Sequence, residues 1–274
     1  MRRTLALVLA VLALAACSEQ TSGVPQPGVF TTAPPTTISA AAGQCLRSAD
    51  LSTVDCGQPH DAEVTAVGEL TGLAAEYPAE RDLRRAALPP CRAALADYLG
   101  SADADATRLQ VRAFWPNKEG WAAGKRWRVC AVVELTPKAE LVTRTGSVKG
   151  LLAAAGFATF QLCSSGSPST EQQLTLTSCA EKHLAEAVPG VLPLGGPADP
   201  APSQEQIDAA AREHCTNAVA AYLGSGDRTD VFPVWRTFGS QGWSEGFTNA
   251  ICYAEATRPF TGRLWGLGAN ALPN

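Results

Sequence analysis

Cysteine, histidine and glutamate recur at matching spacings in this chain, and these residue types often carry chemistry. Cys56 is followed by His60 and Glu63, and a second such pair is His183 and Glu186. A thiolate beside an imidazole can act as a nucleophile, and sulfur with imidazole and carboxylate can bind zinc. Both chemistries need a reduced cysteine and side chains that converge. On a regular strand, residues three apart point to opposite faces, so we expect these histidines and glutamates not to converge.

The number of cysteines favours disulfides over a reactive thiol. The chain has nine cysteines, and the eight other than Cys17 form an even set without a CxxC pair. Such a set is typical of a disulfide framework in an exported protein. The eight cysteines are Cys45, Cys56, Cys91, Cys130, Cys163, Cys179, Cys215 and Cys252. We therefore predict no metal site, no cofactor and no catalytic residue. The chain also lacks G-x-S-x-G, S-x-x-K and H-E-x-x-H motifs, so we expect a protein that is not an enzyme.

The amino-terminal segment predicts export and a lipid anchor. Arg2 and Arg3 precede the apolar run from Leu5 to Ala16, which is too short for the roughly twenty residues that span a bilayer. The run ends in Leu-Ala-Ala-Cys17, which resembles a bacterial lipobox. That resemblance implies a lipoprotein signal over residues 1–17, lipid on Cys17, and anchoring at the outer face of the cytoplasmic membrane. The alternative is an ordinary secretory signal that happens to contain a cysteine.

Residues 18–43 have the composition of a disordered tether. They include four prolines and five threonines but no lysine or arginine, and such a segment buries too little apolar surface to fold. The formal net charge of the chain is −4, and no basic cluster occurs. Nucleic acid is therefore not an expected partner.

The cysteines reveal an internal duplication. A shift of about 123 residues places Cys56, Cys91 and Cys130 within one residue of Cys179, Cys215 and Cys252, and neighbouring residues repeat with them. Cys91 through Tyr98-Leu99-Gly100, for example, corresponds to Cys215 through Tyr222-Leu223-Gly224. We therefore predict two tandem domains, at residues 44–155 and 156–274, of which the second is a diverged copy.

Each half contains the pattern of a small α+β domain. Residues 60–67 alternate as in a half-buried strand, and residues 126–135 and 248–256 are expected to be strands that carry the last cysteine of each set. Residues 204–223 predict a helix with Ser203 as its N-cap. The fold class is therefore α+β, as two disulfide-stapled copies.

Two local questions concern the first long helix and the cysteine pairing. That helix contains Pro89-Pro90 and is expected to kink or restart near Cys91. Four cysteines allow three pairings in each half. We favour the first with the second and the third with the fourth, which would pin a hairpin and clamp the helix to the final strand.

Tryptophan is the other residue type that could contact a ligand. Trp127 and Trp265 have no tryptophan counterpart in the other half, and Arg126 adjoins Trp127. An exposed indole can stack on a sugar ring or anchor an interface, although core packing is the common role. Asp103 and Asp105 lie in a polar stretch and are expected to be solvated. The candidates for contact with a ligand or partner are Trp127, Trp265, Arg126 and His60.

One stretch of the first half resembles a known family. Residues 54–64, Val-Asp-Cys-x2-Pro-His-Asp-Ala-Glu-Val, are similar to the signature of the septum formation domain of actinobacterial envelope proteins. Trp121-x2-Gly124-x-Arg126, then Cys130 and residues 145–147, resemble the rest of that pattern. The second half departs from it, with Asn249 where Arg126 stands. The resemblance implies a link to septation or envelope growth and supplies no catalytic residues.

Together these features predict a non-catalytic, membrane-anchored lipoprotein outside the cytoplasm. We expect it to act as an interaction module in envelope growth or septum formation, with an envelope protein or a cell-wall component as partner. One alternative is a protein that binds cell-wall glycan or a small ligand. The other is a hydrolase whose site is not apparent in the sequence.

Overall fold

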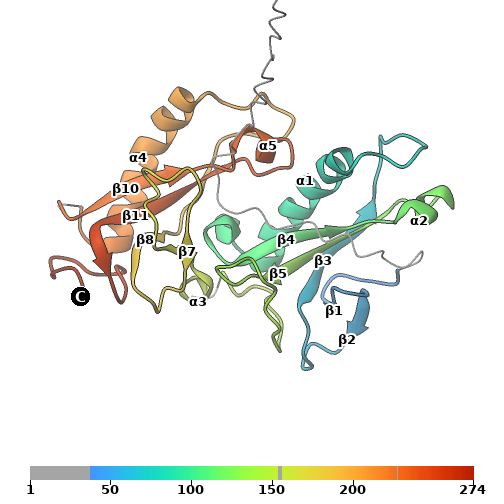
Figure 1. Ribbon diagram of the computed structural model, residues 1–274, viewed down its shortest axis with the longest axis horizontal. Helices are drawn as coiled ribbons and strands as arrows, with labels where there is room; N and C mark the ends of the chain where they lie inside the picture. The colour runs from blue at the N-terminus through green and yellow to red at the C-terminus, as the bar shows by residue number, and fades with distance from the viewer. Residues whose placement is uncertain (1–37, 154–155, 227) are drawn as a thin grey trace, which may run out of the picture.

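The computed structural model describes residues 38–153, 156–226 and 228–274. Cys17, the predicted signal over residues 1–17 and the predicted tether up to residue 37 lie outside the described residues. The described chain is α+β with two antiparallel sheets, as the sequence predicts (Figure 1).

The first sheet has the strand order β2-β1-β3-β5-β4. Its strands are β1 (Cys45–Arg47), β2 (Ser52–Val54), β3 (Ala62–Glu69), β4 (Leu109–Phe114) and β5 (Trp127–Glu134). The accompanying helices are α1 (Glu80–Leu99), the 3-10 helix η1 (Ala102–Ala106) and α2 (Lys118–Ala122).

The second sheet repeats that order as β7-β6-β8-β11-β10, and the short β9 also pairs with β11. Its strands are β6 (Cys163–Ser164), β7 (Leu176–Thr177), β8 (His183–Ala187), β9 (Leu192–Pro193), β10 (Val231–Arg236) and β11 (Asn249–Phe260). The helices are α3 (Phe157–Phe160), α4 (Gln204–Leu223) and α5 (Gly239–Trp243). The long helices α1 and α4 therefore occupy matching places in the two halves.

The four disulfides pair as expected from the sequence. In each half the first two cysteines join short antiparallel strands or the turn beside them, as Cys45–Cys56 and Cys163–Cys179. The other two clamp the long helix to an inner strand of its sheet, β5 or β11, as Cys91–Cys130 and Cys215–Cys252. Closing loops of 39 and 37 residues in this way stabilises each half by about 4 kcal/mol in the chain-entropy model.

Helix α4 forms as its sequence predicts. The Ser203 side chain accepts a hydrogen bond from the Gln206 backbone amide. The Gln206 side chain accepts one from the Ser203 backbone amide, which completes a capping box. The helix ends at Gly224 in the left-handed conformation.

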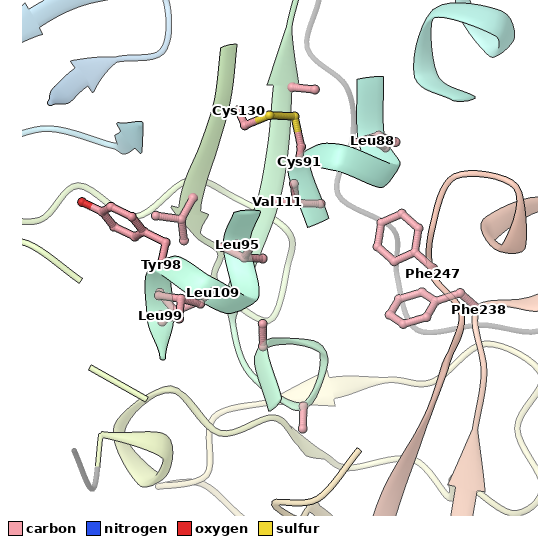
Figure 2. Close-up of a cluster of buried hydrophobic side chains, with 14 of the residues drawn as sticks. Leu88, Cys91, Leu95, Tyr98, Leu99, Leu109, Val111, Cys130, Phe238 and Phe247 are labelled. Carbon is pink, nitrogen blue, oxygen red and sulfur yellow. A yellow bond between two sulfur atoms is a disulfide. The ribbon is translucent and has the colours of Figure 1, made fainter. Parts of the chain in front are cut away.

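Of the two outcomes expected for α1, a kink or a restart near Cys91, the restart does not occur. The helix continues from Glu80 to Leu99 through Pro89 and Pro90, without restarting near Cys91. Its buried face carries Leu88, Cys91, Leu95 and Leu99 against Leu109 and Val111 of β4, beside the Cys91–Cys130 disulfide (Figure 2). Tertiary packing and the disulfide therefore hold the helix where two backbone hydrogen bonds are missing.

Strand β3 is buried on both faces over its first four residues, whereas a half-buried strand was expected. Ala62 and Val64 face one apolar cluster, which contains Leu46 and Val133. Glu63 and Thr65 face the other side of the sheet and are also buried. The alternation of polar residues in the sequence therefore marks a buried polar group and not a solvent face.

One apolar core cluster spans both halves. Phe238 and Phe247 of the second half belong to the same buried cluster as Leu88 and Cys91 of α1, and α1 lies between the first sheet and the second half (Figures 1 and 2). Gly246 approaches α1 so closely that an added Cβ would lie 3.0 Å from Cα of Pro89, and its φ of +88° also favours glycine.

A buried ion pair closes this contact. Arg92 of α1 donates to both carboxylate oxygens of Asp105 in η1, at 2.8 and 2.6 Å, and to the carbonyl of Gly246 at 2.6 Å. Asn249 of β11 donates to the same Asp105 carboxylate at 2.9 Å, and the Arg92 guanidinium lies over the Phe247 ring. Asp105 is 3% exposed, so the expectation that it is solvated is wrong. The sequence could not show that the second half covers this carboxylate.

A second ion pair lies on the same face of α1. Arg84 donates two hydrogen bonds to the buried carboxylate of Glu245, at 2.8 and 2.5 Å. Bidentate arginine–carboxylate pairs fix geometry as well as charge, so the Arg84–Glu245 pair orients the second half along α1.

Among the described residues, no helix is both long enough and apolar enough to span a membrane.

Replacing Asp105 by asparagine leaves the Arg92 charge buried without its carboxylate. We expect Asp105→Asn to lower the free energy of unfolding by about 3 kcal/mol, measured by urea denaturation. The control is Arg81→Ala, which removes an exposed pair with Asp82 and should cost about 0.5 kcal/mol or less. Equal effects of the two substitutions would contradict a buried linkage between the halves.

Candidate ligand-binding groove

Two buried glutamates hold the same position in the two halves. Glu63 of β3 accepts hydrogen bonds from the Tyr98 hydroxyl, the Ser147 hydroxyl and, at 2.8 Å, the Val148 amide. Each glutamate thereby ties a central strand to the long helix and to the loop after the last long strand.

In the second half, Glu186 of β8 accepts from the Tyr222 hydroxyl at 2.6 Å and from the Leu264 amide at 3.0 Å. Burial, and then the charge of Glu186, raise the pKa of Tyr222 far above its usual range. The phenol therefore stays protonated and donates. Burial and the Glu63 carboxylate raise the pKa of Tyr98 in the same direction.

His183 and Glu186 converge, and the expectation from strand alternation is wrong for this pair. His183 Nε2 lies 3.1 Å from a Glu186 oxygen, and both side chains are fully buried. The pairing of β8 with β11 shifts register between Glu255 and Phe260, and the imidazole packs on the Phe260 ring. His183 is the first residue of β8 and lies opposite this irregular part of β11, where the alternation of a regular ladder does not hold.

His60 has a different environment. Its side chain is buried, and Nδ1 lies 2.8 Å from the Gln58 carbonyl oxygen. Nε2 has no hydrogen-bond partner among the described residues and borders an internal cavity of about 10 Å³, which is about the space of one water molecule. His60 is therefore held inside the first half, away from any surface that a partner could touch.

The sulfurs near these carboxylates are oxidised. Cys45 and Cys56 lie near Glu63, and Cys163 lies near His183 and Glu186. All three cysteines are in disulfides, so these clusters offer no thiolate for a metal or a nucleophilic attack.

A groove of about 450 Å³ lies beside α4 in the second half. It is lined by Pro189, Gly190, His214, Asn217, Ala218, Ala221, Tyr222 and Trp265. The helix contributes residues 214, 217, 218, 221 and 222, whose spacing places them on one face. The two alanines leave the space that larger side chains would fill.

The opposite wall is fixed by the first half. The amides of Gly190 and Val191 donate to the Asp103 carboxylate at 2.8 and 3.0 Å, so this carboxylate, like that of Asp105, binds the second half. His214 Nε2 lies 2.6 Å from the Gly190 carbonyl oxygen. Gly190 has a φ of +94°, which favours glycine at this turn.

Trp265 forms the end of the groove and is 58% exposed. The preceding amide, of Leu264, donates to Glu186, and the following amide, of Gly266, donates to the Tyr222 carbonyl at 2.9 Å. Its indole ring lies 6.2 Å from the Tyr222 ring. The backbone on both sides of this exposed indole is therefore pinned to the core.

The equivalent position in the first half is lysine. The Val148 and Gly150 amides make the bonds to Glu63 and to the Tyr98 carbonyl that Leu264 and Gly266 make in the second half, and Lys149 stands between them. Lys149 Nζ lies 5.8 Å from the Tyr98 ring centroid.

The other predicted contact residues lie elsewhere. Trp127 begins β5 and packs partly buried on the outer apolar cluster of the first half. Arg126 places its guanidinium over the Trp121 ring at 3.7 Å and donates to the Trp121 carbonyl. Of the four sequence candidates, only Trp265 lies in the groove.

The remaining groove residues, among them His214 and Asn217, are not among the sequence candidates. The available signals were the three- and four-residue spacing along α4 and the Pro189-Gly190 turn.

A second hollow, of about 280 Å³, lies between β10 and residues 168–172. Arg236 borders it, but its guanidinium donates to the carbonyls of Pro168, Glu171 and Gln172. The Arg236 side chain therefore holds the loop of residues 168–172 in place.

Comparison with known proteins gives one match. A family model described as septum formation matches residues 40–252, which cover most of both halves. No curated protein and no solved structure matches the chain.

The two glutamates provide reciprocal controls for the loops that they hold. Glutamine keeps the shape but turns one acceptor into a donor, so each substitution should lower the free energy of unfolding by about 2 kcal/mol. Glu186→Gln should accelerate the hydrogen–deuterium exchange of the backbone amides of residues 261–268. Glu63→Gln should accelerate the exchange of the amides of residues 145–150. Acceleration of both loops by either substitution would show that the carboxylates act through global stability alone.

Proposed function

Because the chain belongs to the septum formation family, we propose that it is a non-catalytic interaction module in septum formation or envelope growth. The observation that carries this proposal is the family match over residues 40–252. It begins before β1 and ends within β11, so it includes both long helices and leaves out residues 253–274.

The proposal includes a location at the outer face of the cytoplasmic membrane, with lipid on Cys17. The supporting evidence is the sequence of residues 1–17 and the four disulfides, which are typical of an oxidising compartment. An envelope protein is the proposed partner, and a cell-wall component is the alternative.

A non-catalytic role is supported by how the reactive groups are used. Glu63 and Glu186 accept hydrogen bonds from their own helix and loop, and the eight cysteines after Cys17 are in disulfides. His183 is committed to Glu186 and to the Glu181 carbonyl. These groups position the fold and are therefore not free to meet a substrate.

We also propose that the halves arose as tandem copies of one domain, with the boundary between residues 155 and 156. The matching strand order, disulfide pattern and glutamate–tyrosine contacts support this. Trp265 and Lys149 then mark a place where the copies have diverged, so a shared function of the halves is not part of the proposal.

The anchor and the role can be tested together in cells that express the chain. A fluorescently tagged wild-type protein should fractionate with membranes and concentrate at division septa. Crosslinking in intact cells should capture a specific envelope protein. Cys17→Ala should abolish membrane fractionation and septal enrichment, because it removes the lipidated sulfur.

Ser18→Ala is the matched control, since it changes a neighbouring residue and keeps the Cys17 thiol. Its fractionation and its crosslinks should equal those of the wild type. Recovery of peptidoglycan alone, without any protein partner, would overturn the proposed interaction module.

A further inference from the structure

The exposed indole of Trp265 is unusual within this fold. The side chains of Trp115, Trp121 and Trp243 are buried, and Trp235 donates through Nε1 to Asp208. Trp265 instead presents its ring to solvent between two pinned amides at the end of a groove. A large apolar surface held rigidly in water is characteristic of a binding site.

The groove adds neutral polar groups to this platform. The Asn217 side chain makes no hydrogen bond within the described part of the chain, so its amide can both donate and accept. His214 uses Nε2 for the Gly190 carbonyl, which leaves Nδ1 as an acceptor when the ring is neutral. Both side chains line the groove.

Charge narrows the choice of ligand. None of the residues that line the groove in the described chain is Asp, Glu, Lys or Arg. A phosphate, a carboxylate or a cationic group would therefore find no opposite charge there. The groove suits an uncharged ligand with one apolar face and several hydroxyl or amide groups.

The aromatic groups distinguish between two such ligands. A proline-rich peptide binds to a row of exposed aromatic side chains. Here the second aromatic residue, Tyr222, is only 6% exposed and its hydroxyl is bound to Glu186. A pyranose ring needs a single platform, because its C–H face stacks on one indole while its hydroxyls reach the rim.

From these observations we propose that the groove between α4 and Trp265 binds an uncharged pyranose of a glycan. The sugar ring stacks on Trp265, and its hydroxyl or acetamido groups bond to Asn217 and His214. A volume of about 450 Å³ lies in the usual range for small-ligand sites. This site belongs to the second half alone, because Lys149 replaces the indole in the first.

The inference goes beyond the proposed role in septum formation and does not depend on it. The test uses the full chain purified in detergent, titrated in a calorimeter with a tetramer of N-acetylglucosamine and with a tetramer of glucose. We expect saturable binding of at least one tetramer. Trp265→Ala should weaken that binding at least about tenfold, as loss of a central aromatic anchor does, and Asn217→Ala should weaken it about threefold.

Two surface variants serve as matched controls. Phe232→Ala removes another exposed aromatic ring, on β10, and Thr216→Ala changes the exposed neighbour of Asn217 on α4. Both should bind within about twofold of the wild type. Circular dichroism should show that all four variants fold, since every substituted side chain is at the surface.

The proposal is overturned if neither tetramer binds at millimolar concentration, or if Trp265→Ala binds as tightly as the wild type. Tighter binding of a proline decamer than of either saccharide, lost in Trp265→Ala, would assign the groove to a peptide instead. These outcomes concern the purified protein alone. A wild-type protein that concentrates at septa but binds no saccharide would leave the septal role standing and remove only the groove's assignment.

Discussion

The arrangement of this molecule depends on the two carboxylates of η1, a helix of only five residues. Asp105 neutralises Arg92 inside the contact between the halves, and Asp103 accepts the amides of Gly190 and Val191. Removing either carboxylate leaves buried donors of the other half without their acceptor. The first half thus shapes a wall of the groove in the second, so the groove needs both halves.

Within each half, a single buried glutamate holds three elements together. One glutamate joins the central strand, the long helix and the loop after the last long strand, and burial keeps its tyrosine partner protonated. Because the bonds to the loop come from backbone amides, the residue between them is free to change. Lys149 and Trp265 stand at that residue, so the two halves can present different surfaces on one scaffold.

The parts of the fold that depend on neighbouring residues could be predicted from the sequence. Ser203 and Gln206 mark the start of the helix over residues 204–223, and the cysteine pairing that the sequence favoured among three is the one found in each half. Prediction failed where contacts join distant segments. Asp105 meets Asn249 across 144 positions, and Glu63 meets Val148 across 85. The composition of a polar stretch does not reveal such partners, and a buried glutamate looks like a solvent-facing one.

The exposed side chain of Trp265 connects the fold with the proposed ligand site. An indole of this size would stabilise the second half by about 2 kcal/mol if its exposed surface were buried. Pro189, Ala218 and Ala221 line the space beside it, and side chains larger than the two alanines would cover the ring. The space instead stays open, and two backbone hydrogen bonds orient the loop that carries the ring. A stabilising contact left unmade beside a rigid groove is best explained by a ligand that completes it.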